Sequence, residues 1–284
     1  MSRPTAFHGQ PALTAIVAAM NEELAPLRTL LASRTSGYLP GVPLTFGHIG
    51  SAPVALLCTG DGARNARRGL ANMLGQLPVS RVIVAGVSGG VTPDLGVGSL
   101  VLGERVVDAV DESVRRADQA LAEVAARACH APRGIVVTAP RIADCPKDKE
   151  RLREIAALTC GEGATPIAVD LESAVFVDEA TRAGVPSIVV RAISDPAGES
   201  LPAILNRSRD EGGAIRRSRV LLGLLGDPRP LPRLLMLRQR VSACARELAR
   251  AVALIVAALE PASLPVPAAR GANERLDVVV GTEA

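Results

Sequence analysis

Two acids stand where apolar stretches end, Glu172 in AVDLES at residues 168–173 and Asp195 in SIVVRAISD at residues 187–195. Residues 174–183 between them have a helical pattern, and a Gly-Val-Pro turn follows at 184–186. Strand, helix and strand at this spacing predict a βαβ unit, whose crossover places both strands parallel in one sheet. Because ligands bind at the carboxyl ends of parallel strands, we expect Glu172 and Asp195 to face one crevice.

The rest of the chain alternates strands and helices in the same way. Strand patterns cover 14–20, 44–50, 54–58, 81–87 and 134–137, and 95–108 holds another strand. One helical pattern follows residue 20, a second is opened by 59–66 and runs to about 77, and two more cover 112–129 and 147–158. The segments 44–50 and 54–58 are expected to form a hairpin, and Asn21 to cap the helix after the first strand. This alternation predicts the α/β class, a three-layer α/β/α fold with a central mixed, mostly parallel sheet.

The chain is long enough to form one large domain, since it has 284 residues of which 48% are apolar. We expect that domain at 12–260, a flexible N-terminus at 1–11 and a flexible tail at 261–284. Its last helix should carry an apolar stripe made of Leu234, Leu237, Val241, Leu248, Val252, Ile255 and Leu259. Packing of this stripe on the sheet is the main interpretation, and contact of the arginine-rich helix with a membrane surface is the alternative.

Composition excludes several classes of function. The formal net charge is +3 with both signs interspersed, and the aromatic content is 1%, so no nucleic-acid footprint is expected. The 5 cysteines are scattered without a C-x-x-C pair, which predicts reduced thiols, no zinc site and a cytoplasmic location. Residues 1–11 lack the apolar centre of a secretion signal, and the late apolar run 251–259 is shorter than the ~20 residues that span a bilayer.

Four motifs in order resemble a known family: IVAAMNEEL at 16–24, GVSGG at 86–90, VDLESA at 169–174 and RAISD at 191–195. Together they resemble the nucleoside phosphorylase superfamily, and within it the methylthioadenosine/S-adenosylhomocysteine nucleosidase branch, over residues 14–197. Shorter patterns, SDPA at 194–197, LLGDP at 224–228 and LPRL at 231–234, resemble the hopanoid-associated phosphorylase group. That group is implicated in releasing adenine from adenosylhopane.

The resemblance implies roles for three acids in cleaving an N-glycosidic bond. Such cleavage passes through a positively charged sugar and an anionic purine, so the enzyme must hold the ribose and give the base a proton. Asp195 matches the acid that hydrogen-bonds or protonates the purine. Glu172 matches the carboxylate that binds the ribose hydroxyls, and Glu23 the one that positions and deprotonates the attacking water.

The resemblance also implies supporting residues around these acids. Arg191 and Ser194 are expected to frame the same crevice, Arg191 by pairing with Glu172 or Glu23 and Ser194 by orienting Asp195.

Further residues are expected to contact the substrate directly. Ser88 and Gly89 match a loop that closes on the ligand through backbone groups. Leu171 stands where the family usually has Met as a floor under the sugar. Ile142, or a neighbour, must cover the purine face that a Phe usually covers in the nucleosidases.

Each motif also has a structural interpretation. Glu23 lies in the first turn of a helix, where acids are ordinarily solvated. Glu172 and Asp195 could be helix N-caps, and Gly60-x-Gly62 a tight turn rather than an anion cradle.

The expected function is therefore hydrolysis of an adenosine-derived nucleoside, either methylthioadenosine/S-adenosylhomocysteine or adenosylhopane, to release adenine. No metal or organic cofactor is implied, and the resemblance implies a homodimer. One alternative is a phosphate-dependent phosphorylase, with Arg64 or Arg191 as the phosphate ligand. Phosphorolytic relatives carry a Gly-Asp-Pro-x-Arg loop near the N-terminus, whereas this chain has GDPR only at 226–229, which favours water. The other alternative is a non-catalytic nucleoside-binding protein.

Overall fold

The computed structural model of the protein describes residues 12–39, 42–161, 163, 165–210 and 217–259. The expected flexible ends, 1–11 and 261–284, lie outside these residues. The strands are β1 (Leu13–Ala18), β2 (Ala32–Leu39), β3 (Val42–Ile49), β4 (Ala52–Cys58), β5 (Val79–Gly90), β6 (Leu100–Asp108), β7 (Val114–Arg116), β8 (Arg133–Thr138), β9 (Ile167–Asp170) and β10 (Ser187–Asp195). The helices are α1 (Asn21–Leu30), α2 (Ala63–Gln76), α3 (Gln119–Cys129), α4 (Pro146–Cys160), α5 (Ser173–Arg182), α6 (Ile204–Arg207), α7 (Arg217–Gly226) and α8 (Leu231–Ala258).

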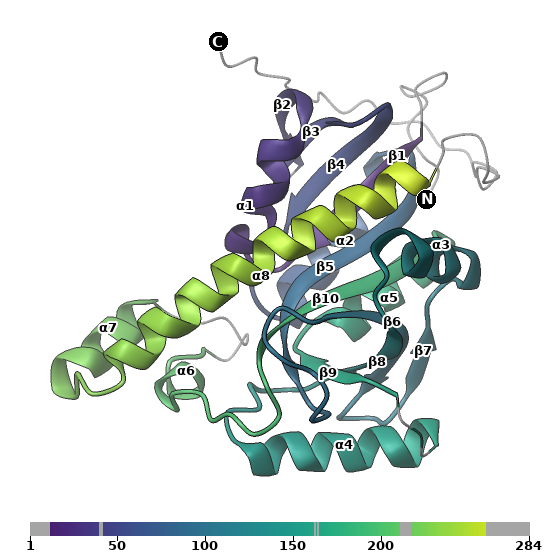
Figure 1. Cartoon of the computed structure of the whole chain (residues 1–284). Coiled ribbons are helices and arrows are strands. Elements are labelled where there is room, and N and C mark those ends of the chain that lie inside the picture. The colour runs from purple at the N-terminus through teal and green to yellow at the C-terminus, as the bar shows by residue number, and fades with distance from the viewer. Residues whose placement is uncertain (1–11, 40–41, 162, 164, 211–216, 260–284) are drawn as a thin grey trace.

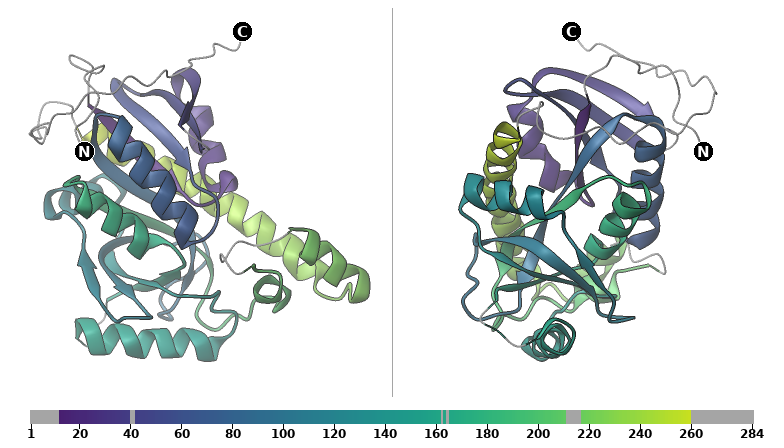
Figure 2. Two further views of the ribbon diagram at one scale, coloured as in Figure 1. Left: turned by 180° about the vertical axis from the view of Figure 1, so that it is seen from behind. Right: turned by 90° about the vertical axis from the view of Figure 1, so that its right-hand side faces the viewer.

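The strands form one mixed sheet with the order β10-β6-β8-β9-β5-β1-β4-β3-β2, and β7 pairs with β6 (Figure 1). Because β10 also pairs with β5, the strands β10, β6, β8, β9 and β5 close into a ring. From β5 the sheet continues outward through β1 and β4 to the β3–β2 edge. Helices α1, α3 and α8 cover one face of the sheet and α2 and α5 the other (Figure 2), so the expected α/β/α class is confirmed.

The two cores follow from the two-residue period of the strands. In β1, Ala15 and Val17 face the core shared with α2 and α5, whereas Ile16 and Ala18 face the core shared with α1 and α8. The same alternation occurs in β4 and β5. Strands that are buried on both faces appear in the sequence as continuous apolar runs, which is why these were recognisable.

The predicted βαβ unit is wrong in its strand directions. β9 pairs antiparallel with β5, through Gly89↔Val169 and Gly90↔Ala168, whereas β10 pairs parallel with β5. β9 has only 4 residues and crosses the far end of the 12-residue strand β5, so the helix between β9 and β10 does not make a crossover between parallel neighbours. The ends of β9 and β10 nevertheless meet beside the end of β5.

Local predictions fail at three places. Strand β2 was missed, and the segment 112–129 is not one helix, because β7 precedes α3 and Asp118 caps α3 through a 2.9 Å hydrogen bond from the Leu121 N–H. Asn21 is the first residue of α1 rather than its cap. Met20 occupies the N-cap position, and its N–H is bound by the side chain of Glu23.

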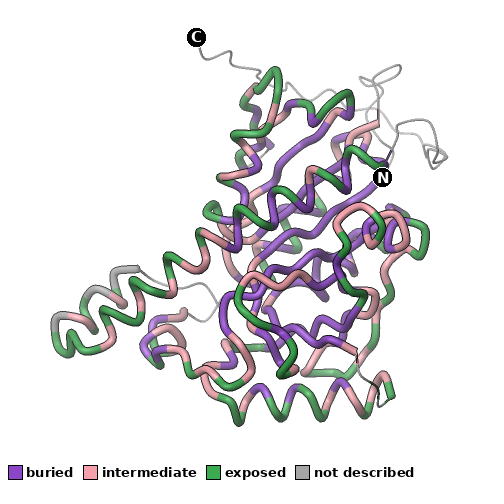
Figure 3. Tube along the Cα trace, in the orientation of Figure 1, coloured by how far each residue is buried: buried purple, intermediate pink, exposed green. Residues whose placement is uncertain are grey.

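Helix α8 packs along only part of its length. It has 28 residues, and its buried residues begin at Cys244 and continue to Val256. The predicted stripe therefore enters the core in the second half of the helix, whereas Leu234, Leu237 and Val241 in the first half stay partly exposed (Figure 3). Among the described residues, no helix is both long and apolar enough to cross a bilayer.

Candidate active site

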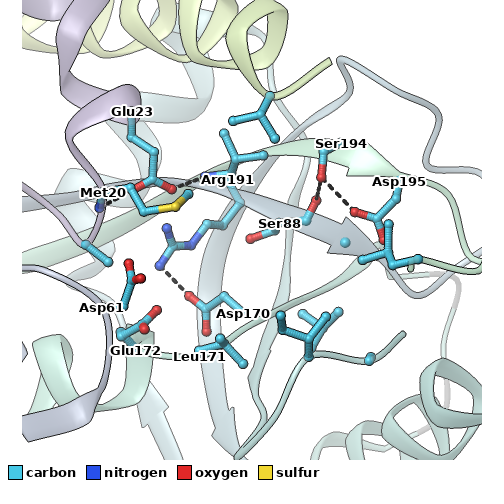
Figure 4. Close-up of a pocket in the computed structure, with 18 of the residues that line it drawn as sticks. Met20, Glu23, Asp61, Ser88, Asp170, Leu171, Glu172, Arg191, Ser194 and Asp195 are labelled. Atoms are coloured by element: carbon cyan, nitrogen blue, oxygen red, sulfur yellow. Dashed lines mark hydrogen bonds and ion pairs between the residues drawn. The ribbon is translucent and has the colours of Figure 1, made fainter. Parts of the chain in front are cut away.

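A cavity of about 240 Å³ opens where the ends of β5, β9 and β10 meet (Figure 4). Its lining comes from segments far apart in the chain: the start of α1, the end of β5, the β9–α5 junction, the end of β10 and the first half of α8. The residues proposed from the sequence for a nucleosidase site all line this cavity, namely Glu23, Ser88, Gly89, Ile142, Leu171, Glu172, Arg191, Ser194 and Asp195.

Glu23 is held at the cavity by backbone donors on both sides. Its Oε2 accepts the Met20 N–H at 2.9 Å, and its Oε1 accepts the Val87 N–H at 2.8 Å. The side chain is buried rather than solvated, because α1 begins against the end of β5. Burial raises the pKa of Glu23 to about 7, and the nearby charge of Arg191 opposes this shift. A carboxylate with this pKa can accept a proton near neutral pH.

Glu172 occupies the N-cap position of α5, but its side chain makes no cap hydrogen bond. Its Oε1 accepts the Gly62 N–H at 2.9 Å. Gly60 and Gly62 have φ angles of +79° and +94°, a backbone that glycine adopts without strain, and this turn presents the Gly62 N–H. The Gly-x-Gly turn therefore binds a carboxylate of the protein. Burial, and then the charge of Asp170, raise the pKa of Glu172 to about 7.

Asp195 is paired with a lysine that sequence reasoning missed. Lys149 of α4 is 1% exposed, and its Nζ donates to Asp195 Oδ2 at 2.6 Å and to the Pro196 carbonyl at 2.7 Å. Ser194 Oγ donates to Asp195 Oδ1 at 2.6 Å. Burial raises the pKa of Asp195, and the Lys149 ammonium opposes that rise.

Lys149 lies in the charged sequence PKDKERLRE, which is typical of a solvated helix. Its spacing does carry a signal, because Lys149 lies three and seven residues before Leu152 and Ala156 and shares their buried face.

Arg191 does not form the ion pair expected with Glu172 or Glu23. Its Nη2 is bonded to Asp170 Oδ2, and the same nitrogen donates to Ser173 Oγ at 2.7 Å. Asp170 also accepts the Thr138 hydroxyl at 2.9 Å, so this buried acid has a full set of partners. The guanidinium lies between Glu23 and Asp170 (Figure 4) and acts on Glu23 through its charge.

Two glycines of β5 make room for the side chains of β10. The strand register places Gly86 opposite Arg191 and Gly89 opposite Asp195. A Cβ on Gly86 would lie 1.6 Å from Arg191 Nη1, and one on Gly89 would lie 2.9 Å from Asp195 Oδ2. The prediction that Ser88 and Gly89 belong to a loop is wrong, because both are strand residues.

We expect Gly86→Ala to destabilise the protein by about 1–3 kcal/mol, because the new methyl group must displace the buried guanidinium of Arg191. Gly75→Ala is the matched control, since Gly75 lies inside helix α2 with nothing within 4 Å of the added Cβ. It should be neutral or stabilising by up to about 1 kcal/mol. Chemical denaturation measures both, and equal stability of the two variants would contradict the close approach at Gly86.

The segment after β8 is fixed at the cavity mouth by Asn206. Asn206 Oδ1 accepts the Ile142 N–H at 3.1 Å, and Asn206 Nδ2 donates to the Ile142 carbonyl at 2.8 Å. Among the described residues, the aromatic side chain in the cavity lining is Phe176 of α5, which was not proposed from the sequence. Its position in an amphipathic helix gave no signal beyond core packing.

A separate group of metal-ligand types lies outside the cavity lining. Asp144, Cys145 and Asp148 have ligand atoms within 4.8 Å of one another in the described part of the chain. Protein partners account for both acids, because Asp148 accepts Arg141 at 2.7 Å and Asp144 accepts Asn206 at 2.9 Å. We assign no metal to this group.

Comparison with known proteins identifies relatives that match most of this chain. The profile of the Phosphorylase superfamily matches residues 14–225. The 5'-methylthioadenosine/S-adenosylhomocysteine nucleosidase of Geobacillus thermodenitrificans is 31% identical over 206 residues, which cover 65% of this chain and 84% of that protein. The enzyme of the same name from Hydrogenovibrio crunogenus is 27% identical over 232 residues, which cover 74% of this chain and 97% of that protein.

Solved structures agree on the fold. That of the Neisseria meningitidis methylthioadenosine/S-adenosylhomocysteine nucleosidase with methylthio-immucillin-A has a TM-score of 0.69 at 20% identity and covers 87% of this chain and 100% of that one. The futalosine hydrolase of Helicobacter pylori has a TM-score of 0.64 at 18% identity, over 87% and 98% of the two chains. The chain belongs to the phosphorylase superfamily and is an enzyme that cleaves N-glycosidic bonds.

Proposed function

We propose that the protein is a purine nucleosidase that hydrolyses an adenosine-derived nucleoside and releases adenine. The observation that carries the proposal is the convergence of Glu23, Glu172 and Asp195 on one cavity of about 240 Å³. The relatives named as methylthioadenosine/S-adenosylhomocysteine nucleosidases support the same reaction class.

The two ends of the cavity suit the two halves of a nucleoside. Asp195 and Ser194 lie at one end, and Glu23 and Glu172 lie together at the other (Figure 4). We place the purine at Asp195 and the ribose at Glu172, which can accept hydrogen bonds from its hydroxyls. Ser88 lies between the two ends, and its Oγ is buried in the wall without a hydrogen-bond partner among the described residues.

The reaction then needs a base that takes a proton from the attacking water on one side of the sugar. On the other side it needs an acid that gives a proton to the departing purine. Water positioned by Glu23 attacks C1' of the ribose and gives a proton to the carboxylate. The bond from C1' to the purine breaks with its electron pair going to the base, and Asp195 gives a proton to the imidazole ring of the base. In the free enzyme Asp195 is a carboxylate paired with Lys149, which also positions it. Asp195 takes up a proton from solvent before each turnover, and Glu23 releases one to solvent afterwards.

The substituent on the ribose is proposed from the outer wall of the cavity. That wall is apolar and is formed by Leu201, Leu205, Leu237 and Val241. An apolar wall favours an uncharged substituent, such as the methylthio group of methylthioadenosine or the hydrocarbon of adenosylhopane. The homocysteine group of S-adenosylhomocysteine is charged and fits this wall less well.

Water is favoured over phosphate by the charges around the cavity. Arg191 is already bonded to Asp170 and Ser173, and Arg64 is exposed and does not line the cavity. The cavity lining instead contains Asp61, together with several other acids, which repel a phosphate dianion.

We expect adenine release to proceed at the same rate with and without inorganic phosphate. A coupled assay for free adenine, run on phosphate-free enzyme with methylthioadenosine, measures this directly. The sugar product should be the free ribose derivative. Strict dependence on phosphate, with a sugar 1-phosphate as the product, would identify a phosphorylase. Nucleoside binding without any adenine release would contradict the proposed reaction.

We also propose a cytoplasmic homodimer. The dimer rests on the resemblance to a family whose members generally self-associate. The cytoplasmic location is supported by the free thiols of Cys58, Cys129, Cys145, Cys160 and Cys244.

A further inference from the structure

Helix α7 and the first half of α8, residues 217–243, form an arm that extends beyond the body of the protein (Figures 1 and 3). The second half of α8 anchors the arm, because its buried residues from Cys244 to Val256 pack on the sheet and on α1 and α3. The α8 half of the arm contains no buried residue. The arm therefore has a surface that its own domain does not cover.

Large apolar side chains are exposed along the arm. Leu222 is 67% exposed, Leu231 43%, Leu235 51% and Met236 42%. Single exposed leucines are ordinary, but Leu231 and Leu235 lie one turn apart in α8 and share one face of the helix. We take this face as a contact surface.

The same arm is strongly basic. Arg229, Arg233 and Arg238 are exposed, and Asp227 is the one acid in residues 219–239. Apolar and basic side chains together on a helix are typical of segments that lie in the interface of an anionic bilayer. The apolar groups enter the acyl boundary, and each arginine gains from the negative surface potential.

The arm also borders the catalytic cavity. Leu237 and Val241 of α8 line that cavity, one and two turns beyond the exposed arginine at 233. Arg233, Met236 and Leu237 line an adjoining hollow together with residues 198–202. The outer wall of the active site thus continues into the exposed surface of the arm.

We propose that the arm docks on the surface of an anionic lipid bilayer and opens the cavity toward it. The proposal rests on the proposed function, because a nucleoside with a hydrocarbon substituent would reach the cavity from the lipid phase. A second copy of the chain fits this surface less well. A twofold contact sets the same patch against itself, and here it would set two basic patches against each other.

The test is co-flotation of the full chain with vesicles, without nucleoside. The wild-type protein should bind vesicles of mixed phosphatidylglycerol and phosphatidylcholine and should bind pure phosphatidylcholine weakly. The double variants Leu231→Asp/Leu235→Asp and Arg229→Glu/Arg238→Glu should each lose binding to the mixed vesicles by at least about tenfold. Leu254→Asp and Arg246→Glu are matched controls, since both are exposed residues in the anchored half of the same helix and should leave binding unchanged.

Two further measurements separate this proposal from others. Adenine release from soluble methylthioadenosine should be the same in the double variants and the wild type, so a failure of docking is distinguishable from a failure of the nucleosidase proposal. Sedimentation velocity should give the same oligomeric state for all variants. Absence of wild-type binding to the anionic vesicles would overturn the docking proposal. Dissociation of a dimer by Leu231→Asp/Leu235→Asp would overturn it too, because the arm would then be the interface between two copies.

Discussion

Asp195→Asn is expected to lower kcat for adenine release by about 10²–10⁴-fold, the usual contribution of a positioned general acid. The amide keeps the size of the carboxyl group but cannot give the purine a proton. Because this contribution is made mainly in the transition state, KM should change much less than kcat.

The variant also disturbs a buried ion pair, and this effect has to be separated from catalysis. Removing the carboxylate leaves the Lys149 ammonium buried without its counter-charge, and breaking such a pair costs about 3–5 kcal/mol of stability. The double variant Lys149→Met/Asp195→Asn removes both charges and should recover most of this stability. Its kcat should stay as low as that of Asp195→Asn.

Asp178→Asn is the matched control. Asp178 accepts two hydrogen bonds from Arg115, at 2.8 and 2.9 Å, and does not line the cavity. Asp178→Asn should leave kcat within about twofold, because Asp178 does not line the cavity. It should also cost little stability, since a partly exposed ion pair contributes little to it. Recovery of kcat along with stability in the double variant would show that Asp195 acts only through the fold.

The sequence predicted most of the sheet because its strands are buried on both faces. A strand such as β5, with successive residues facing different cores, leaves a continuous apolar run that is visible without any structure. The acids of the candidate site were visible for the same reason, since Glu172 and Asp195 interrupt apolar patterns at strand ends. The direction of β9 relative to β5 could not be predicted from the sequence. The pairing of β9 with the glycines at the end of β5 joins residues about eighty positions apart.

The sequence also could not predict which residues pair with the buried charges. Glu23, Asp170 and Glu172 all line the cavity with Arg191, and only the tertiary structure shows that Arg191 bonds Asp170. Lys149 is similar, because a lysine in a charged helix is ordinarily solvated and only the position of α4 beneath the end of β10 buries it. Local pattern identifies which residues are unusual, whereas tertiary packing decides what they contact.

Glu23→Gln is expected to lower kcat by about 10²–10⁴-fold, because the amide cannot accept the proton of the attacking water. The wild-type value of kcat/KM should rise with pH and level off above about 7, where Glu23 becomes ionised. Glu172 has a pKa near the same value and interacts with Glu23, so this rise belongs to the coupled pair. In Glu172→Gln, kcat/KM should still rise with pH, because Glu23 is still present. In Glu23→Gln, the residual kcat/KM should lose the part of this rise that comes from the ionisation of Glu23.

The stability of Glu23→Gln tests the same ionisation without any substrate. The folded-state pKa of Glu23 is about 7 and its ordinary value is 4.5, so the neutral form favours folding and ionisation opposes it. The wild-type protein should therefore lose stability relative to the variant as pH rises from 4.5 through about 7, with no further change above that. The expected total is about 3 kcal/mol in the free energy of unfolding. A difference that stays constant over this pH range would mean that Glu23 is already ionised at pH 5, and a carboxylate with so low a pKa is a poor base for activating water.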